Sequence, residues 1–286
     1  MERRTVLVAG ATGNQGGSVA RALLNAGHKV LGISRNVDSS NAEVLKSLGA
    51  TLVSVSFSDQ ERLIEIVTEV DTVFSMTTPF EGGMEAEIEQ GKTLVNAAQA
   101  SGVGHFIFNS VGDADLPTGI PHFDSKYEVE KHLISQKVPY TIVAPSYFMD
   151  NLFFQFNIES LNQGLLKMAM PGDRVLQQIA VEDIGNFVRW VAEEREKVFG
   201  QRFNISGDEL SGDKAAQILS AVLDKEIRYE GFSPDYMKEQ SEDMALMFQW
   251  FIDHGYTANL AALKKYNFMS FEQWAMKQDW KSILSS

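Results

Sequence analysis

The stretch that most constrains the fold of this chain is "TVLVAGATGNQGGSVARALL", residues 5–24. Gly10, Gly13 and Gly16 form the pattern G-x-x-G-x-x-G between an apolar run and an amphipathic stretch. In such a strand–loop–helix unit the first glycine permits a tight turn, the second lets a pyrophosphate approach the backbone, and the third lets the helix pack on the sheet. The amide end of the helix attracts phosphate. The pattern therefore predicts a dinucleotide-binding loop.

Further apolar runs follow, separated by longer stretches with helical periodicity. Strands that alternate with helices predict an α/β fold with a doubly wound parallel sheet covered on both faces. We expect residues 1–155 to form the nucleotide-binding domain, completed by about residues 177–206. Residues 156–176 and 207–286 are expected to form a smaller, mostly helical region that binds substrate or partner. The expected strands are 5–10, 29–34, 51–56, 71–76, 105–110, 140–145 and 200–206.

Composition excludes several classes of protein. The formal net charge is −13, from 38 acidic and 25 basic residues, so direct binding of nucleic acid is not expected. Cysteine is absent, which removes disulfides and thiolate metal sites, and no H-x-x-x-H pattern suggests another metal site. No apolar run approaches the roughly 18 residues of a membrane span, and "MERRTVLVAG" lacks a signal-peptide layout. A cytoplasmic protein is the expectation.

The end of the second expected strand bears on which dinucleotide binds. An acidic residue there binds the ribose 2′-hydroxyl of NAD, whereas a basic residue accommodates the 2′-phosphate of NADP. Arg35 ends the stretch "GISRN", and Asp38 follows three residues later. The planar guanidinium of Arg35 matches phosphate oxygens. This favours NADP over NAD, with Asp38 as the argument for NAD.

Four stretches resemble the NmrA-like family of atypical short-chain dehydrogenases/reductases. These are "GATGNQGGSVARALL", "EQGKTLVNAAQASGV", "HFDSKYEVE" and "PYTIVAPSYFMDNL", in the family's order. The resemblance implies a Rossmann-like fold and a preference for NADP. It also implies one of two roles: reduction of quinones, dyes or other carbonyl and aromatic compounds, or loss of catalysis and regulation through protein partners in response to NADP(H).

The same resemblance implies which residues contact the cofactor. Some of these residues also have an ordinary alternative: Lys92 as an exposed helix lysine, Arg35 as a surface arginine, and Tyr147 and Phe148 as core aromatics. The implied contacts are Gly10, Thr12, Gly13, Asn14, Gln15, Gly16, Arg35, Ser56, Phe57, Thr77, Thr78, Lys92, Lys126, Tyr147, Phe148 and Met149.

Two overlapping registers compete in "HFDSKYEVEK". Tyr127-x-x-x-Lys131 has the spacing of a reductase's proton relay, and His122-x-x-x-Lys126 repeats it five residues earlier. At roughly 100° per residue, the two lysines point about 140° apart on one helix. The apolar positions of that helix place Lys126 near the buried arc and Lys131 outside it. We therefore interpret Tyr127 and Lys131 as a chance match, and Glu128 and Glu130 as part of a partly solvated helix.

Two groups remain as candidates for catalysis. His122 occupies the place of a proton-donating tyrosine, and Ser110 ends a strand where a substrate-orienting serine is expected. Each also has a structural alternative, a hydrogen-bonded loop histidine and a turn-capping serine. Because the tyrosine is missing, we predict an NADP(H)-binding sensor or regulator that acts through protein partners. The alternative is an NADPH-dependent reductase of a quinone-like, carbonyl or other flat apolar substrate.

Overall fold

The computed structural model describes residues 2–285, which form two compact units. Unit 1 contains the residues up to Pro117 together with Pro121–Ala144 and Val181–Phe203. Unit 2 contains Thr118–Ile120, Pro145–Ala180 and the residues from Asn204 onward. Among the described residues, no helix is both long enough and apolar enough to cross a membrane.

Unit 1 is built on a seven-stranded sheet with the order β10-β6-β5-β4-β1-β2-β3. The pairings from β3 through β6 are all parallel. The four residues of β4 and of β5 are buried throughout, as strands covered on both faces must be. This confirms the predicted Rossmann-like α/β fold. The strands are β1 (Thr5–Ala9), β2 (Lys29–Ile33), β3 (Thr51–Val53), β4 (Thr72–Ser75), β5 (Phe106–Asn109), β6 (Tyr140–Pro145) and β10 (Gln201–Ile205).

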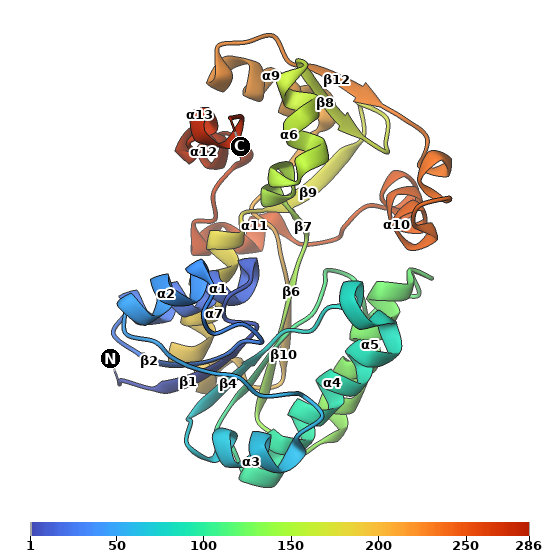
Figure 1. Ribbon diagram of the computed structural model, residues 1–286. Helices are drawn as coiled ribbons and strands as arrows, with labels where there is room; N and C mark the ends of the chain where they lie inside the picture. Colours follow the sequence, from blue (N-terminus) through green and yellow to red (C-terminus); the bar gives the residue numbers. More distant parts are fainter. Residues whose placement is uncertain (1, 286) are drawn as a thin grey trace. The chain divides into compact units, whose positions relative to one another are not determined.

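Helices cover both faces of this sheet. In Figure 1, α1, α2 and α7 lie on one face, and α3, α4 and α5 lie on the other. The strand order reverses between β1 and β4, and ligands of open α/β sheets bind outside the carboxyl ends of the strands at such a switch point. The helices are α1 (Asn14–Asn25), α2 (Ser40–Ser47), α3 (Gln60–Thr68), α4 (Pro79–Ser101), α5 (Pro121–Ser135), α7 (Val181–Glu193) and α8 (Arg195–Val198).

Local sequence sets where these helices begin and end. Ser39 and Asp59 cap α2 and α3 by accepting hydrogen bonds from the amides of Ala42 and Arg62. Helix α4 ends at Ser101 and is followed by Gly102, whose φ of 68° is left-handed and therefore suits glycine.

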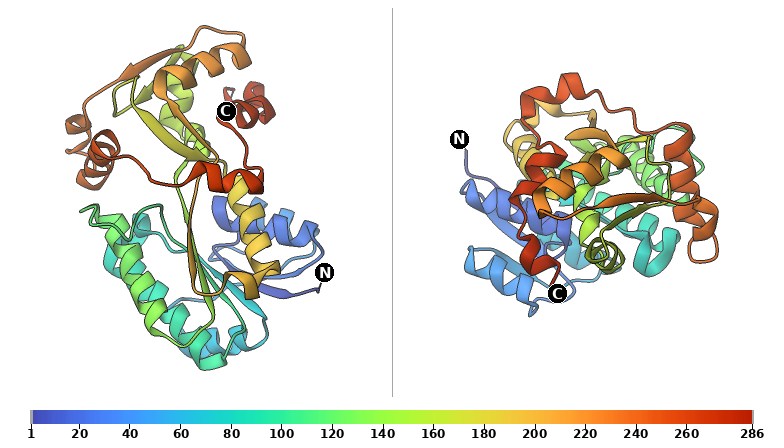
Figure 2. Two further views of the ribbon diagram at one scale, coloured as in Figure 1. Left: turned by 180° about the vertical axis from the view of Figure 1, so that it is seen from behind. Right: turned by 90° about the horizontal axis from the view of Figure 1, so that it is seen from above.

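Unit 2 contains two small sheets, with the orders β11-β9-β7 and β12-β8. Both views of Figure 2 show β12 alongside β8, to which it pairs in parallel. The strands are β7 (Tyr147–Phe148), β8 (Leu165–Met168), β9 (Val175–Ile179), β11 (Asp208–Ser211) and β12 (Arg228–Gly231). The α-helices are α6 (Gln155–Asn162), α9 (Gly212–Leu223), α10 (Glu242–Asp253), α11 (Leu260–Leu263), α12 (Phe271–Lys277) and α13 (Trp280–Ile283), and the 3-10 helices are η1 (Met149–Phe153), η2 (Pro234–Met237) and η3 (Lys264–Tyr266).

Residues 145–155, which the sequence groups with the nucleotide-binding domain, cluster with unit 2. The reason is pairing: β7 follows β6 directly but hydrogen-bonds to β9, with Tyr147 opposite Gln178. The tail beyond Gly207 is mostly helical, as expected, but it also carries β11 and β12. These strands have four residues each, too short for periodicity to reveal.

The buried His105 should make the stability of the protein depend on pH. Its Nε2 lies 2.9 Å from Thr141 Oγ1, and burial, followed by the charges of Arg195 and Arg4, lowers the pKa of His105 to about 3. Below about pH 6.5, His105 therefore binds a proton in the unfolded chain but stays neutral in the native state. As pH falls from about 6.5 toward 3, wild type should lose up to about 1.4 kcal/mol per pH unit through this residue.

A non-titrating replacement isolates that contribution. Urea unfolding of wild type and His105→Asn between pH 7 and 4 should give a shallower pH dependence for the variant. His132→Asn is the control, because His132 is only partly buried and burial lowers its pKa less strongly. Parallel pH profiles for wild type and His105→Asn would contradict this assignment.

Candidate functional site

The glycine loop joins β1 to α1 at the switch point of the unit 1 sheet. Gly10 has a φ of +63°, and the amide of Gly13 donates to Gly10 O at 3.0 Å, which closes a tight turn. Gly13 is the N-cap of α1, and no side chain caps this end of the helix. The first-turn amides of α1 therefore face outward as a group, the arrangement that binds a phosphate.

Gly16 lets α1 approach β1 closely. A Cβ at this position would lie 2.2 Å from Gly10 O and 2.9 Å from Ala9 O, both backbone atoms. At Gly13 a Cβ would lie 3.4 Å from Gly10 O and meet nothing closer, and the residue is exposed. The two glycines thus serve different purposes: Gly16 is needed by the fold, whereas Gly13 leaves room above the backbone.

Neighbouring side chains hold this loop in place. Thr12 Oγ1 lies 2.7 Å from Ser34 Oγ, and Thr12 O accepts a hydrogen bond from Asn41 Nδ2 at 3.0 Å. Gln15 Oε1 accepts a hydrogen bond from Asn109 Nδ2 at 3.1 Å, while Asn14 is exposed. Thr12 and Gln15 therefore already have protein partners.

Sequence reasoning missed Asn109, the last residue of β5. It is 1% exposed, and its Oδ1 has no hydrogen-bond partner among the described residues. The available signal was its place at the carboxyl end of a central strand, where ligands bind in this class of sheet.

The structure brings together Arg35, Ser56 and Phe57, three of the cofactor contacts that the family resemblance implied. They line a cavity of about 390 Å³ with residues of α4, among them Gln90 and Thr93. Glu89 lines the same cavity and adds a negative charge to it. The cavity has guanidinium and hydroxyl donors of the kind that a phosphate or ribose uses.

Asp38, the acidic residue that favoured NAD, has a lysine of the protein as its partner. Its Oδ1 lies 3.7 Å from Lys46 Nζ on α2. Ser39, which could have donated to a phosphate, caps α2 with its hydroxyl.

Lys126 is held by a buried carboxylate. Its Nζ donates to Thr77 O and to Glu87 Oε1, each at 2.8 Å. Glu87 on α4 is fully buried and also accepts from the hydroxyls of Thr77 and Ser125. The sequence predicted Thr77 and Lys126 as site residues but missed Glu87, because nothing local distinguishes it from other glutamates of α4.

His122 and Lys126 lie on the same side of α5, one turn apart. Helix α5 begins at Pro121, so His122 is its second residue and does not lie in a loop. His122 is 8% exposed, and its ring packs perpendicular to that of Phe123 at 4.8 Å between centroids. Tyr127 and Lys131, the alternative pair, lie on the outer side of α5. Lys131 is exposed, pairs with Glu128 and lies over the Tyr127 ring.

Ser110 is hydrogen-bonded to a second buried ion pair, the one between Glu130 and Arg202. Its hydroxyl donates to Glu130, which is 1% exposed and is bound by Arg202 through Nε at 2.9 Å and Nη2 at 3.2 Å. Arg202 also lies 3.0 Å from Asp115. The expectation that Glu130 belongs to the solvated part of this helix is therefore wrong, because its side chain is buried where it meets Arg202 of β10.

Two further predicted cofactor contacts, Lys92 and Thr78, have neighbours within unit 1. Lys92 lies near His132 of α5, whose pKa is lowered by burial and by the lysine's charge. Thr78 caps α4 through a hydrogen bond from the Phe80 amide at 3.4 Å.

Three of the predicted contacts lie in unit 2. Tyr147 packs against Phe248 and Phe251, and burial raises the pKa of its phenol. Phe148 pairs with Ile179 in β9. Met149 is fully buried in the apolar core.

Comparisons with known proteins agree on one family. The model of the NmrA-like family matches residues 2–276. An NmrA-like family domain-containing protein of Dictyostelium discoideum is 32% identical over 267 residues, which cover 88% of each chain.

Two solved structures have the same fold. NmrA, a negative transcriptional regulator solved with NADP, has a TM-score of 0.82 at 21% identity, and the match covers 98% of this chain and 100% of NmrA. The triphenylmethane reductase of Citrobacter sp., solved with NADP(H), has a TM-score of 0.80 at 21% identity over 96% and 99% of the chains. Because the family model covers residues 2–276 and a relative of the same family is 32% identical, the chain belongs to the NmrA-like family.

Proposed function

We propose that this protein binds NADP(H) and acts as a cofactor sensor that regulates protein partners in the cytoplasm. One observation carries the proposal: the phosphate-binding loop is open, while the side chains that would serve catalysis have protein partners. Gly13 is exposed at an uncapped helix end. Ser110 donates to Glu130, and Lys126 to Glu87 and Thr77.

The residues of unit 1 fit a nicotinamide dinucleotide. The pyrophosphate would lie on the amides of Asn14 and Gln15, where Gly13 leaves room for it. Arg35 and Ser56 would bind the 2′-phosphate of NADP in the cavity that they line. Two of the three N–H groups of the Lys126 ammonium form hydrogen bonds within the protein, so the third can donate a hydrogen bond to a ribose hydroxyl.

A regulatory role agrees with the arrangement around Lys126 and Ser110. A short-chain reductase needs a proton donor within hydrogen-bond reach of the reacting carbonyl. Here the tyrosine is replaced by a buried histidine, and the serine is held by a carboxylate. NmrA, which shares the fold, is itself described as a negative transcriptional regulator.

The second candidate is an NADPH-dependent reductase of a flat apolar substrate. His122 favours it, because this residue lies one helical turn before Lys126 and an imidazole can transfer protons near neutral pH. The nicotinamide would supply the hydride, and His122 or water the proton. Triphenylmethane reductase has the same fold.

Turnover separates the two candidates. NADPH-saturated protein would be mixed with a panel of quinones, enals and dyes, and NADPH consumption followed by absorbance. The sensor consumes at most one equivalent of NADPH per chain. Multiple turnovers on any member of the panel would contradict the sensor, and a loss of that activity in His122→Asn would support the reductase.

Replacing Arg35 tests the preference for NADP. Removing a guanidinium that binds the 2′-phosphate should weaken NADPH about tenfold or more, since charge-assisted hydrogen bonds contribute roughly 1.5–3 kcal/mol. NADH binding to Arg35→Ala should change less than about twofold, within the few tenths of a kcal/mol of a surface substitution. Arg62→Ala, at an exposed position of α3, is the matched control. Equal weakening of both cofactors would contradict the assignment of Arg35.

A further inference from the structure

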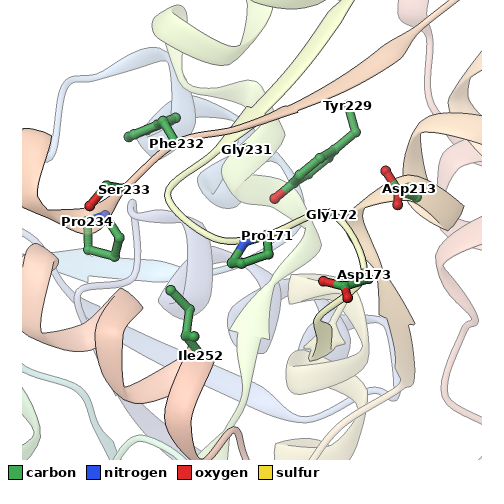
Figure 3. Close-up of a pocket in the computed structure, with 10 residues that line it drawn as sticks. All are labelled: Pro171, Gly172, Asp173, Asp213, Tyr229, Gly231, Phe232, Ser233, Pro234 and Ile252. Atoms are coloured by element: carbon green, nitrogen blue, oxygen red, sulfur yellow. The ribbon is translucent and has the colours of Figure 1, made fainter.

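Unit 2 contains a pocket of its own, with a volume of about 650 Å³. This volume suits a drug-sized molecule, since ligand pockets span roughly 300–1,000 Å³. Four segments contribute to it: the loop before β9, the start of α9, the region of β12 and η2, and helix α10. Figure 3 shows the lining residues Pro171, Gly172, Asp173, Asp213, Tyr229, Gly231, Phe232, Ser233, Pro234 and Ile252.

Tyr229 fixes the walls of this pocket. A Cβ on Gly212, Gly172 or Gly231 would lie 2.1, 2.9 or 3.2 Å from an atom of its ring, so the ring fills the space that three glycines leave. Its hydroxyl donates to Met170 O at 2.7 Å, which joins β12 to the loop before β9. Burial, followed by the charge of Asp213, raises the pKa of Tyr229, so the phenol keeps its proton. The pocket is therefore formed before a ligand arrives, which reduces the entropic cost of binding.

One end of the pocket is acidic. Asp173 and Asp213 flank Gly172, whose added Cβ would lie 2.4 Å from Asp213 Oδ1. Neither carboxylate forms an ion pair within residues 2–285. The main-chain amide of Asp213 donates to Gly172 O at 2.9 Å, which fixes the two acidic positions relative to each other. Two unneutralised carboxylates attract a cation and repel an anion.

The remainder of the pocket is mostly apolar, with the hydroxyl of Ser233 as a polar group among its lining side chains. Phe232, Pro234 and Ile252 lie away from the two carboxylates in Figure 3. Proline and aromatic surfaces of this kind accept a flat hydrocarbon body, and burial of apolar area contributes roughly 25 cal/mol per Å². Charge at one end and apolar surface at the other define the polarity of the ligand.

We propose that this pocket of unit 2 is a binding site for a small organic cation with a flat or apolar body. The ammonium or amidinium group would lie between Asp173 and Asp213, and the body would pack on Phe232, Pro234 and Ile252. This site consists only of unit 2 residues and does not depend on the proposed cofactor role.

Two probes of equal shape and opposite charge test the site. They are 9-aminoacridine, a flat fluorescent cation at neutral pH, and acridine-9-carboxylate, its anionic counterpart. Fluorescence titration of the full chain without added nucleotide should give saturable binding of the cation at one site per chain. The anion should bind at least tenfold more weakly.

Three variants locate the binding. Asp173→Asn/Asp213→Asn should weaken 9-aminoacridine at least tenfold, and Glu272→Gln, an exposed carboxylate of α12 outside the pocket, should not change it. Ile252→Lys places a cation in the pocket from a half-buried position of α10 and should abolish binding even if the aspartate variants unfold. The proposal would be overturned if the protein bound both probes with equal affinity. It would also be overturned if Glu272→Gln weakened 9-aminoacridine as much as the double aspartate variant does, or if folded Ile252→Lys bound it like wild type.

Discussion

Gly13→Ala should remove NADPH binding from a protein that still folds, whereas Gly16→Ala should damage the fold itself. At Gly13 the backbone has an ordinary φ of −83°, and an added methyl group meets nothing closer than 3.4 Å. Alanine there should leave stability within about 1 kcal/mol of wild type, because loss of chain entropy in the unfolded state favours alanine slightly. The same methyl group stands where a pyrophosphate must approach, so NADPH affinity should fall about 100-fold.

Gly16→Ala provides the matched comparison. Its methyl group would lie 2.2 Å from a backbone oxygen that no rotamer change can move away. Overpacking of this kind costs roughly 1–3 kcal/mol, and the shift of α1 should weaken NADPH as well. Urea unfolding gives the stability of each variant, and fluorescence titration gives its NADPH affinity. Unchanged NADPH binding by Gly13→Ala would show that the cofactor does not lie on this loop.

Arg202→Met should destabilise the protein by about 3–5 kcal/mol, because it leaves the carboxylate of Glu130 buried without its cation. Glu130 is 1% exposed and accepts from two nitrogens of Arg202 as well as from Ser110. Urea unfolding measures the loss. The exposed pair Lys131–Glu128 is the control: Lys131→Met should cost less than about 1 kcal/mol.

A double variant separates an unpaired charge from lost packing. Glu130→Leu/Arg202→Met removes both charges and should recover most of the stability, since apolar replacements of buried ion pairs are often neutral. If Arg202→Met were within 1 kcal/mol of wild type, the buried pair would not hold β10 to α5. If the double variant were as unstable as the single one, packing rather than charge would be the cause.

The sequence predicted the parts of the fold that depend on neighbours along the chain. Six of the seven strands of unit 1 were visible as apolar runs and β10 as a shorter strand-like stretch, and the glycine spacing placed the turn before α1. Lys126 on the buried side of α5 and Lys131 on the outer side followed from helical geometry together with the family resemblance of "HFDSK".

The sequence could not show partners that meet only in the folded chain. Glu87 and Lys126 are 39 residues apart, and Glu130 and Arg202 are 72 residues apart. A buried glutamate has the same local pattern as a solvated one, so both Glu87 and Glu130 were missed as buried charges. The boundary of unit 2 was displaced for a similar reason: β7 follows β6 in sequence but pairs with β9.

The central claim is that this chain binds NADP(H), and calorimetric titration of NADPH into the protein of residues 1–286 tests it most directly. We expect one saturable site per chain, with NADPH bound more tightly than NADH and no oxidation of the nucleotide during the titration. Absence of saturable heat with both nucleotides, from protein shown to be folded by circular dichroism, would contradict the account.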